Sequence, residues 1–343
     1  MRSLRKILWP FSIIYDLVTW LRNLLYDWGI FKSTAFDLPI ICVGNLSVGG
    51  TGKTPMIEYL IALLDTDYHI ATLSRGYGRK TKGYRLATEE DDATTVGDEP
   101  LQFFKKFKEI DVAVAENRVI GIKKLIDKET PPQVILLDDA FQHRRVKAGL
   151  NMMLTAYDDI FYKDLVLPAG SLRESKRGAR RADVIVVTKC PENLSNTKQL
   201  LVASKIGLKT DQKLFFSTIA YSDDVLGIDT KKKLSTLKKK AVLLITGIAK
   251  PAPLLTHLEK EGISFKHLAF SDHHNFSEAE IEKIRQLSKG KEILTTEKDF
   301  LRLHKKLKGV SMYYLPISVS FLGDTAGFES LILEYVDTNK KKA

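Results

Sequence analysis

A glycine-rich turn that directly follows a short apolar stretch constrains the fold of this chain more than any other feature. Residues 44–55 read Gly-Asn-Leu-Ser-Val-Gly-Gly-Thr-Gly-Lys-Thr-Pro, and residues 39–43 before them read Pro-Ile-Ile-Cys-Val. Apolar residues then recur at helical spacing from Met56 to Leu64. A strand, a glycine-rich turn and a helix in this order predict a loop whose backbone amides bind phosphate groups.

The side chains of this turn suit a nucleoside triphosphate. Lys53 is placed to reach the β- and γ-phosphates, and Thr54 is placed to ligate Mg²⁺. The expected nucleotide contacts are Gly49, Gly50, Thr51, Gly52, Lys53 and Thr54. The strict form of this motif has a glycine at the position of Ser47, so an ordinary tight turn remains an alternative.

The charge balance of the chain narrows the class of its partners. A net charge of +11 favours an anionic partner, which means nucleic acid, an anionic membrane or a phosphorylated small molecule. The lysines are scattered and do not alternate with aromatic residues on a strand face, which argues against nucleic acid. Cys42 and Cys190 lie in or just after apolar runs, and we expect both thiols to be buried and reduced.

The N-terminal stretch predicts an amphipathic helix. Charged residues at Asp16, Arg22 and Asp27 interrupt its apolar character and argue against a helix that spans a membrane. All three tryptophans of the chain lie here, at Trp9, Trp20 and Trp28. Aromatic anchors next to basic residues are typical of a helix that lies in a membrane interface, whereas packing on the domain core is the alternative.

The alternation of apolar and amphipathic segments predicts an α/β fold of the P-loop NTPase type. We expect a mostly parallel sheet with flanking helices, followed by a smaller α/β domain that is joined through a two-stranded connector, residues 214–221 and 312–321. The lysine-rich residues 231–240 are expected to be solvated surface. The expected divisions are residues 1–32 for the amphipathic helix, 33–222 for the core, 223–310 for the smaller domain and 311–343 for the return strand and C-terminal segment.

Carboxylates follow the predicted strands, where ligands of parallel sheets bind. Asp138 and Asp139 end the apolar run of residues 134–137 and are candidate Mg²⁺ ligands beside Thr54. Asp98 and Glu99 lie in a Gly-Asp-Glu-Pro turn, where one of them would accept a hydroxyl proton or, alternatively, would cap the next helix.

Histidines mark two further loops. Gln142 and His143 follow the carboxylate pair, next to two arginines. In the smaller domain, His273 belongs to the run Asp-His-His-Asn-Phe, where it would pair with a carboxylate; helix capping by Asp272 or Ser277 is the alternative reading. The stretch Val-Thr-Lys-Cys-Pro at residues 187–191 lacks the aspartate of guanine-specific switches, which favours ATP.

Together these motifs resemble the tetraacyldisaccharide 4′-kinase family, the lipid A 4′-kinases. The matching segments are residues 44–55, Ser74-Arg-Gly-Tyr-Gly-Arg79, Gly97-Asp-Glu-Pro100, Asp138-Asp-Ala-Phe-Gln-His143, Pro168-Ala-Gly-Ser-Leu-Arg-Glu174, Asp272-His-His-Asn-Phe276 and Thr296-Glu-Lys-Asp299. Ala140 stands where the family usually has glycine. The resemblance implies transfer of the γ-phosphate of ATP to the 4′-hydroxyl of a tetraacyldisaccharide 1-phosphate.

The resemblance also implies roles for individual residues. Asp98 would be the catalytic base and His273 its partner, while Lys53 would act on the transferred phosphate. The metal would be served by Thr54, Glu99, Asp138 and Asp139. The lipid headgroup would be contacted by Tyr77, Arg118, Gln142, His143, Arg173 and Glu174. We expect a monomer that binds ATP, Mg²⁺ and an anionic membrane surface, on the cytoplasmic face of the bacterial inner membrane, and that binds no nucleic acid.

Overall fold

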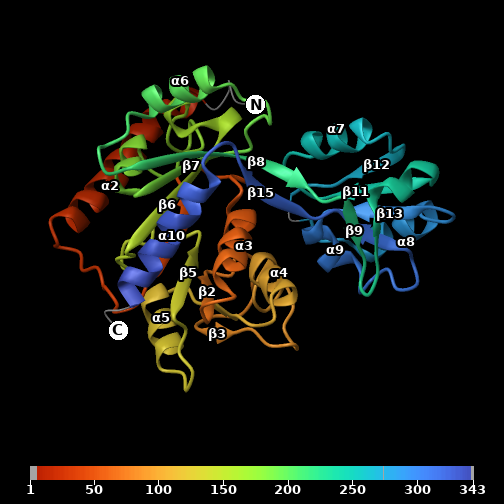
Figure 1. The fold of residues 1–343 in the computed structure, drawn as a ribbon, viewed down its shortest axis with the longest axis horizontal. Coiled ribbons are helices and arrows are strands. Elements are labelled where there is room, and N and C mark those ends of the chain that lie inside the picture. The colour runs from red at the N-terminus through yellow and green to blue at the C-terminus, as the bar shows by residue number, and fades with distance from the viewer. Residues whose placement is uncertain (1–5, 273, 341–343) are drawn as a thin grey trace. The chain divides into compact units, whose positions relative to one another are not determined.

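The computed structural model describes residues 6–272 and 274–340 and forms two compact units (Figure 1). The first unit contains residues 1–219 and 319–343, and the second contains residues 220–318. Each unit is built on its own sheet with helices packed against it. The expected α/β fold with a large, mostly parallel sheet is therefore confirmed.

The sheet of the first unit has β1 near its centre. Its strand order in the described chain is β15-β8-β7-β6-β1-β5-β2-β4-β3. The strands are β1 (Ile40–Asn45), β2 (Ile70–Ser74), β3 (Arg85–Leu86), β4 (Asp111–Val114), β5 (Val134–Asp138), β6 (Leu150–Ala156), β7 (Val184–Thr188), β8 (Lys213–Tyr221) and β15 (Ile317–Phe321). Because β1 runs parallel to both β5 and β6, with Val43 opposite Asp138 and Met152, the segments that follow these three strands leave the same edge.

Helices bury both faces of this sheet, which explains why its central strands are apolar throughout. The helices are α2 (Trp9–Asp27), α3 (Lys53–Leu64), α4 (Asp98–Lys106), α5 (Arg118–Ile126), α6 (Asn196–Ile206) and α10 (Thr325–Lys340), with short 3₁₀ turns η1 (Lys6–Leu8), η2 (Tyr157–Asp159), η3 (Phe161–Lys163) and η4 (Lys176–Arg181). Figure 1 shows α3 and α10 on one side of the sheet, where Met56 and Phe328 join a single core cluster. On the opposite face Ile122 and Val202, from α5 and α6, join another.

The second unit has a sheet with the strand order β10-β9-β14-β13-β11-β12 in the described chain. Its elements are β9 (Asp224–Leu226), β10 (Lys231–Lys233), η5 (Leu234–Lys239), β11 (Val242–Thr246), α7 (Ala252–Lys260), β12 (Phe265–Ala269), α8 (Glu278–Leu287), β13 (Glu292–Thr295), α9 (Glu297–Leu303) and β14 (Met312–Tyr314). Strands β11, β12, β13 and β14 are parallel, so this unit repeats the α/β pattern on a smaller scale.

One expectation for the second unit needs correction. The single strand expected over residues 312–321 is broken before Ile317: β14 belongs to the second sheet and β15 to the first. Pro316 lies at the break, and a proline has no backbone N–H with which to continue a ladder. Most lysines of residues 231–240 are exposed, as expected, while Leu234 and Leu237 between them are buried in the core.

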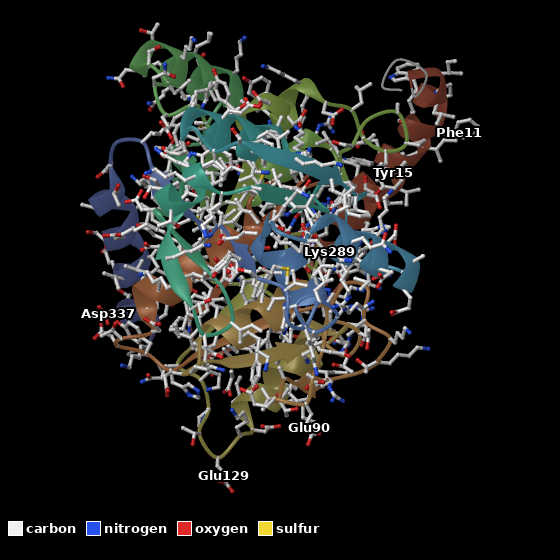
Figure 2. All side chains as sticks on the ribbon, turned by 90° about the vertical axis from the view of Figure 1, so that its right-hand side faces the viewer. Phe11, Tyr15, Glu90, Glu129, Lys289 and Asp337 are labelled. Carbon is white, nitrogen blue, oxygen red and sulfur yellow. The ribbon has the colours of Figure 1, made fainter. Side chains whose placement is uncertain are left out.

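The N-terminal helix forms as expected, with its polar face toward the rest of the first unit and its apolar face toward the outside. The apolar side chains of Ile14, Leu17 and Val18 are 62%, 58% and 61% exposed, whereas Ser12 is the buried residue of α2. Figure 2 shows Phe11 pointing away from the body of the unit. In the described part of the chain, no helix is long and apolar enough to cross a membrane.

Candidate active site

The phosphate-binding loop leaves the central strand β1 and enters α3. Gly49 and Gly52 have φ values of 136° and 87°, a region that favours glycine, and α3 begins at Lys53. Side chains from the end of β7 hold the loop: the Thr188 hydroxyl donates to the Thr51 carbonyl at 2.7 Å, and Lys189 Nζ donates to the Gly50 carbonyl at 2.6 Å. Thr188 and Lys189 follow the apolar run of residues 184–187, but their bonds to the loop leave no signal in the sequence.

The first half of the loop pairs with residues 164–174, here called the bridging segment. The Val48 amide donates to the Ser171 carbonyl at 2.7 Å, and the Arg173 amide donates to the Leu46 carbonyl at 2.6 Å. Ser47 lies between these bonds in an isolated β-bridge with Leu172. Ser47 does not have a positive φ, so this position needs no glycine, which accounts for the departure from the strict motif.

Two adjacent carboxylates end β5 next to this loop. Asp138 is only 5% exposed, and its Oδ1 atom is buried without a hydrogen-bond partner in the structure. Burial, followed by the charge of Asp139, raises the pKa of Asp138 to about 7. The carboxylate of Glu99 acts in the same direction, so α4 brings Glu99 within electrostatic reach of this pair.

Asp139 links the phosphate-binding loop to the bridging segment. Its φ of 48° is rare for a residue other than glycine and turns the chain sharply after the strand. Arg173 Nη1 donates to Asp139 Oδ1 at 2.8 Å, and Lys53 Nζ lies 3.7 Å from the same oxygen. Burial opposes ionisation, but Lys53 and Arg173 outweigh it and hold the pKa of Asp139 below its usual value.

Asp98 and Glu99 form the first turn of α4 rather than its cap. Gly97 is the N-cap residue, with φ 96°, and no side chain caps the helix. A Cβ atom at Gly97 would lie 3.1 Å from the Tyr77 carbonyl, so the helix start packs tightly on the loop of residues 75–79. Asp98 is 9% exposed, and Tyr77 is 72% exposed at the surface of that loop.

Arg118 and His143 meet at the start of α5. Arg118 is 3% exposed; its Nη1 donates to the Ala115 carbonyl, and its Nε is buried without a partner in the structure. The Arg118 amide donates to His143 Nε2 at 3.4 Å. Burial, followed by the charge of Arg118 and other arginines, lowers the pKa of His143 to about 4, so this imidazole is neutral at pH 7.

Glu174, the last residue of the bridging segment, is a buried carboxylate with several hydrogen-bond partners. It is 3% exposed and accepts two hydrogen bonds from Arg181, at 2.8 Å each. Gln142 Nε2 donates to Glu174 Oε1 at 2.9 Å, and Asn23 Nδ2 of α2 donates to Glu174 Oε2 at 2.7 Å. The Glu174 carboxylate therefore links three parts of the unit: α2 through Asn23, the loop after β5 through Gln142, and η4 through Arg181.

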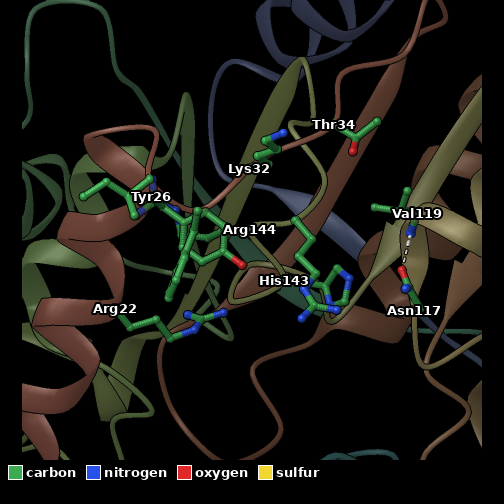
Figure 3. Close-up of a pocket in the computed structure, with 11 residues that line it drawn as sticks. Arg22, Tyr26, Lys32, Thr34, Asn117, Val119, His143 and Arg144 are labelled. Atoms are coloured by element: carbon green, nitrogen blue, oxygen red, sulfur yellow. Dashed lines mark hydrogen bonds between the residues drawn. The ribbon is translucent and has the colours of Figure 1, made fainter.

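A basic pocket of about 700 Å³ opens beside these residues (Figure 3). Its lining includes the cationic side chains Arg22, Lys32, Arg144 and Arg145, together with Asn117 and His143. Arg22 and Arg144 both lie over the Tyr26 ring, at 5.3 Å and 5.1 Å from its centroid. The charge and the size of the pocket suit an anionic group on a bulky molecule.

The expected residues of the second unit follow the strand β12. His273 lies outside the described residues. His274 contacts Glu280 Oε1 through its Nε2 atom at 3.0 Å, and Ser277 forms a capping box with Glu280 at the start of α8. The capping alternative thus holds for Ser277. Cys42 and Cys190 are both buried and unpaired, as expected.

The residues around Asp138 fit a divalent cation. Among the described residues, no group of three or more histidine, cysteine, aspartate and glutamate side chains is placed to hold a metal ion. Mg²⁺, however, is bound by only one or two carboxylates together with phosphates and water. The buried, unpartnered Asp138 Oδ1 and the hydroxyl of Thr54 at the start of α3 are suitable oxygen ligands.

Comparison with known proteins identifies the family of this chain. Residues 4–337 match the family model of tetraacyldisaccharide-1-P 4′-kinase. The chain belongs to this kinase family. A tetraacyldisaccharide 4′-kinase from Flavobacterium johnsoniae is 51% identical over 339 residues and 99% of each chain, and one from Bacteroides fragilis is 45% identical over 99% of this chain and 95% of that one. A crystal structure of LpxK from Aquifex aeolicus in complex with ATP has a TM-score of 0.78 and 30% identity, covering 97% of this chain and 99% of that one.

The low pKa of His143 predicts a pH dependence of the kinase's stability. An unfolded histidine binds its proton near pH 6.5, whereas His143 in the folded protein binds it near pH 4. The free energy of unfolding should therefore fall as the pH drops from about 6.5 toward 4, by at most about 1.4 kcal/mol per pH unit from this group. Urea unfolding of the wild type and His143→Gln at pH 7 and pH 5 measures it. The variant should lose less stability than the wild type; an imidazole that titrates near 6.5 by NMR would contradict the assignment.

Proposed function

We propose that this chain transfers the γ-phosphate of ATP to the 4′-hydroxyl of a tetraacyldisaccharide 1-phosphate through the residues at the carboxyl edge of β1 and β5. The observation that carries this proposal is that Asp138 and Asp139, at the end of β5, lie next to the phosphate-binding loop, with Lys53 of the loop 3.7 Å from Asp139. Family membership supplies the reaction, and this arrangement supplies the chemistry that phosphoryl transfer requires, which is positioning and charge stabilisation.

On the donor side, the loop residues 49–54 bind the phosphates of ATP through backbone amides and the N-terminus of α3. Lys53 stabilises the charge that develops on the transferred phosphoryl group, and Asp139 with Asn45 holds its ammonium group in place. Thr54 and Asp138 would hold Mg²⁺, with Glu99 near them. The cation, when bound, supplies charge neutralisation between the β- and γ-phosphates.

On the acceptor side, Asp98 accepts the proton of the 4′-hydroxyl as its oxygen bonds to the γ-phosphorus and the bond to the ADP oxygen breaks. His273, which the family resemblance pairs with Asp98, would orient or polarise that carboxylate. Arg118 and neutral His143 contact the headgroup, and Gln142 and Arg173 border it. We assign the 1-phosphate to the basic pocket, because Arg22, Lys32 and Arg145 give it the charge that a phosphate needs, whereas Arg144 is paired with Asp27.

The outward-facing apolar side chains of α2 support a peripheral membrane contact. Trp9, Phe11 and Ile14 are more than half exposed along the helix, and Trp28 and Ile30 continue the apolar surface beyond its end. An apolar surface of this size is stable when lipid covers it. Such a contact would bring the basic pocket to the anionic headgroups at the cytoplasmic face of the inner membrane.

Loss of the lysine amine tests the donor side. Lys53→Ala should lower kcat by about 10²–10³-fold, because the charge on the transferred phosphoryl group loses its nearest side-chain cation. Steady-state kinetics with ATP, Mg²⁺ and the lipid acceptor in detergent measures the effect, with circular dichroism as the check of folding. Lys205→Ala, an exposed lysine on α6, serves as the control and should keep wild-type kinetics. Near-normal turnover of folded Lys53→Ala would contradict the phosphate-binding assignment.

Coupling between Asp98 and His273 tests the acceptor side. Asp98→Ala and His273→Ala should each lower turnover by about 10²–10⁴-fold, and the double variant should be little worse than Asp98→Ala, because residues that act as a unit are not additive. His304→Ala is the matched control in the second unit, since the His304 ring bonds to its own helix at the Phe300 carbonyl. If the two single losses multiply in the double variant, the residues act independently.

Substitutions on the exposed face of α2 test the membrane contact. The double variant Leu17→Gln and Val18→Gln should weaken binding to vesicles that contain anionic lipid by at least about tenfold, because two apolar side chains would no longer be buried in lipid. Co-sedimentation measures it. Leu200→Gln with Leu201→Gln, at two leucines of α6 that are 71% and 55% exposed, is a comparable double change away from α2 and should bind normally. Equal loss in both variants would place the contact elsewhere.

A further inference from the structure

The polar face of α2 contacts the loops of the candidate active site. Ser12 is 3% exposed; its hydroxyl donates to the Val166 carbonyl at 3.1 Å and accepts a hydrogen bond from the Ala169 amide at 2.9 Å. The Tyr15 hydroxyl donates to the Arg173 carbonyl at 2.9 Å. Asn23 Nδ2 donates to Glu174 Oε2 at 2.7 Å. Three side chains that are spaced along one face of the helix thus hold the bridging segment over most of its length.

The bridging segment also contacts the phosphate-binding loop and its carboxylates. Its other edge pairs with residues 46–48 through backbone hydrogen bonds, and the Arg173 side chain bonds to Asp139. Asp139 in turn lies against Lys53. A continuous path of one hydrogen bond and two ion pairs therefore leads from Tyr15 through Arg173 and Asp139 to Lys53.

A helix that served only as an anchor would not need this polar interface. Ser12 and Tyr15 bond to backbone atoms of the bridging segment, and Asn23 bonds to the Glu174 side chain. Buried backbone polar groups are almost always paired in this way. The Ala169 amide is the clearest case, because it is buried and its bond goes to Ser12 Oγ. The apolar face of the same helix is exposed to solvent. The polar face therefore holds the bridging segment, and the apolar face is available for contact with lipid.

We propose that Ser12, Tyr15 and Asn23 are positioning residues: they set the geometry of the bridging segment, and through it the placement of Arg173 against Asp139. In this view α2 is part of the active site, and it cannot be removed as a separate membrane anchor without disturbing the acceptor side. The kinetic consequence rests on the proposed kinase function, whereas the positional claim does not.

Hydrogen exchange tests the positional claim without any assay of activity. In the full-length double variant Ser12→Ala and Tyr15→Phe, backbone amides of residues 165–173 should exchange at least about tenfold faster than in the wild type, with the Ala169 amide changed most. Thr19→Ala is the matched control, because the Thr19 hydroxyl bonds only within the helix, to the Asp16 carbonyl, among the bonds that the structure gives it. Unchanged exchange in residues 165–173 would overturn the proposal, and so would faster exchange spread evenly over the first unit.

Kinetics in detergent then tests the catalytic consequence. The double variant should raise KM for the lipid acceptor by about tenfold or more, clearly more than KM for ATP, and leave vesicle binding unchanged. The Leu17→Gln and Val18→Gln variant should instead weaken vesicle binding, and the Leu200→Gln and Leu201→Gln variant of α6 should change neither KM for the acceptor nor vesicle binding. Ser12→Ala alone should raise KM for the lipid acceptor. Ser12→Thr keeps the hydroxyl and should keep this KM near the wild-type value.

The outcomes separate this proposal from the proposed function. Equal losses for ATP and acceptor, or a wild-type acceptor KM in the double variant, would overturn the positioning role. If the wild type transfers no phosphate to the lipid while the exchange result holds, the proposed function fails and the contact between α2 and the bridging segment stands.

Discussion

The buried carboxylate at the end of β5 is the constraint on which the rest of the site depends. Asp138 is almost inaccessible to water, and a charge in that position is costly unless it is paired or binds a cation. Asp139 beside it is stabilised by Lys53 and Arg173, whereas Asp138 Oδ1 has no hydrogen-bond partner in the structure. Asp138 therefore offers a buried carboxylate oxygen without a protein partner, which is the basis of the metal-binding role proposed for it.

Two residues in the loops around these charges have positive φ values, which residues other than glycine rarely adopt. In the described chain, the residues other than glycine with positive φ are Asp139 and Lys189, at the ends of β5 and β7. Such conformations cost of order 1–3 kcal/mol each and persist where the surrounding structure fixes them. Asp139 is fixed by Arg173, and Lys189 by its bond to the Gly50 carbonyl, so both support the phosphate-binding loop.

Much of the first unit was predictable from sequence, because the signals there are local. Strand, turn and helix around Lys53 follow from periodicity and glycines, and Asp138 and Asp139 follow from the end of an apolar run. The break before Ile317 was marked by Pro316, but only the structure shows that the two halves join different sheets. The buried positions of Leu234 and Leu237 were hidden among lysines. Contacts between distant segments, such as Tyr15 with Arg173 or Ser47 with Leu172, leave no signal in a single sequence, because neither partner is unusual in its own neighbourhood.

The most direct test of the central claim is the identity of the phosphorylated product. The wild-type protein would be incubated with ATP, Mg²⁺ and a tetraacyldisaccharide 1-phosphate, and the lipid would be followed by phosphorus NMR and mass spectrometry. The account predicts a second phosphomonoester on the lipid, at the 4′ position, formed in equal amount with ADP. Release of ADP without phosphate transfer to the lipid, or phosphorylation at another hydroxyl, would contradict it.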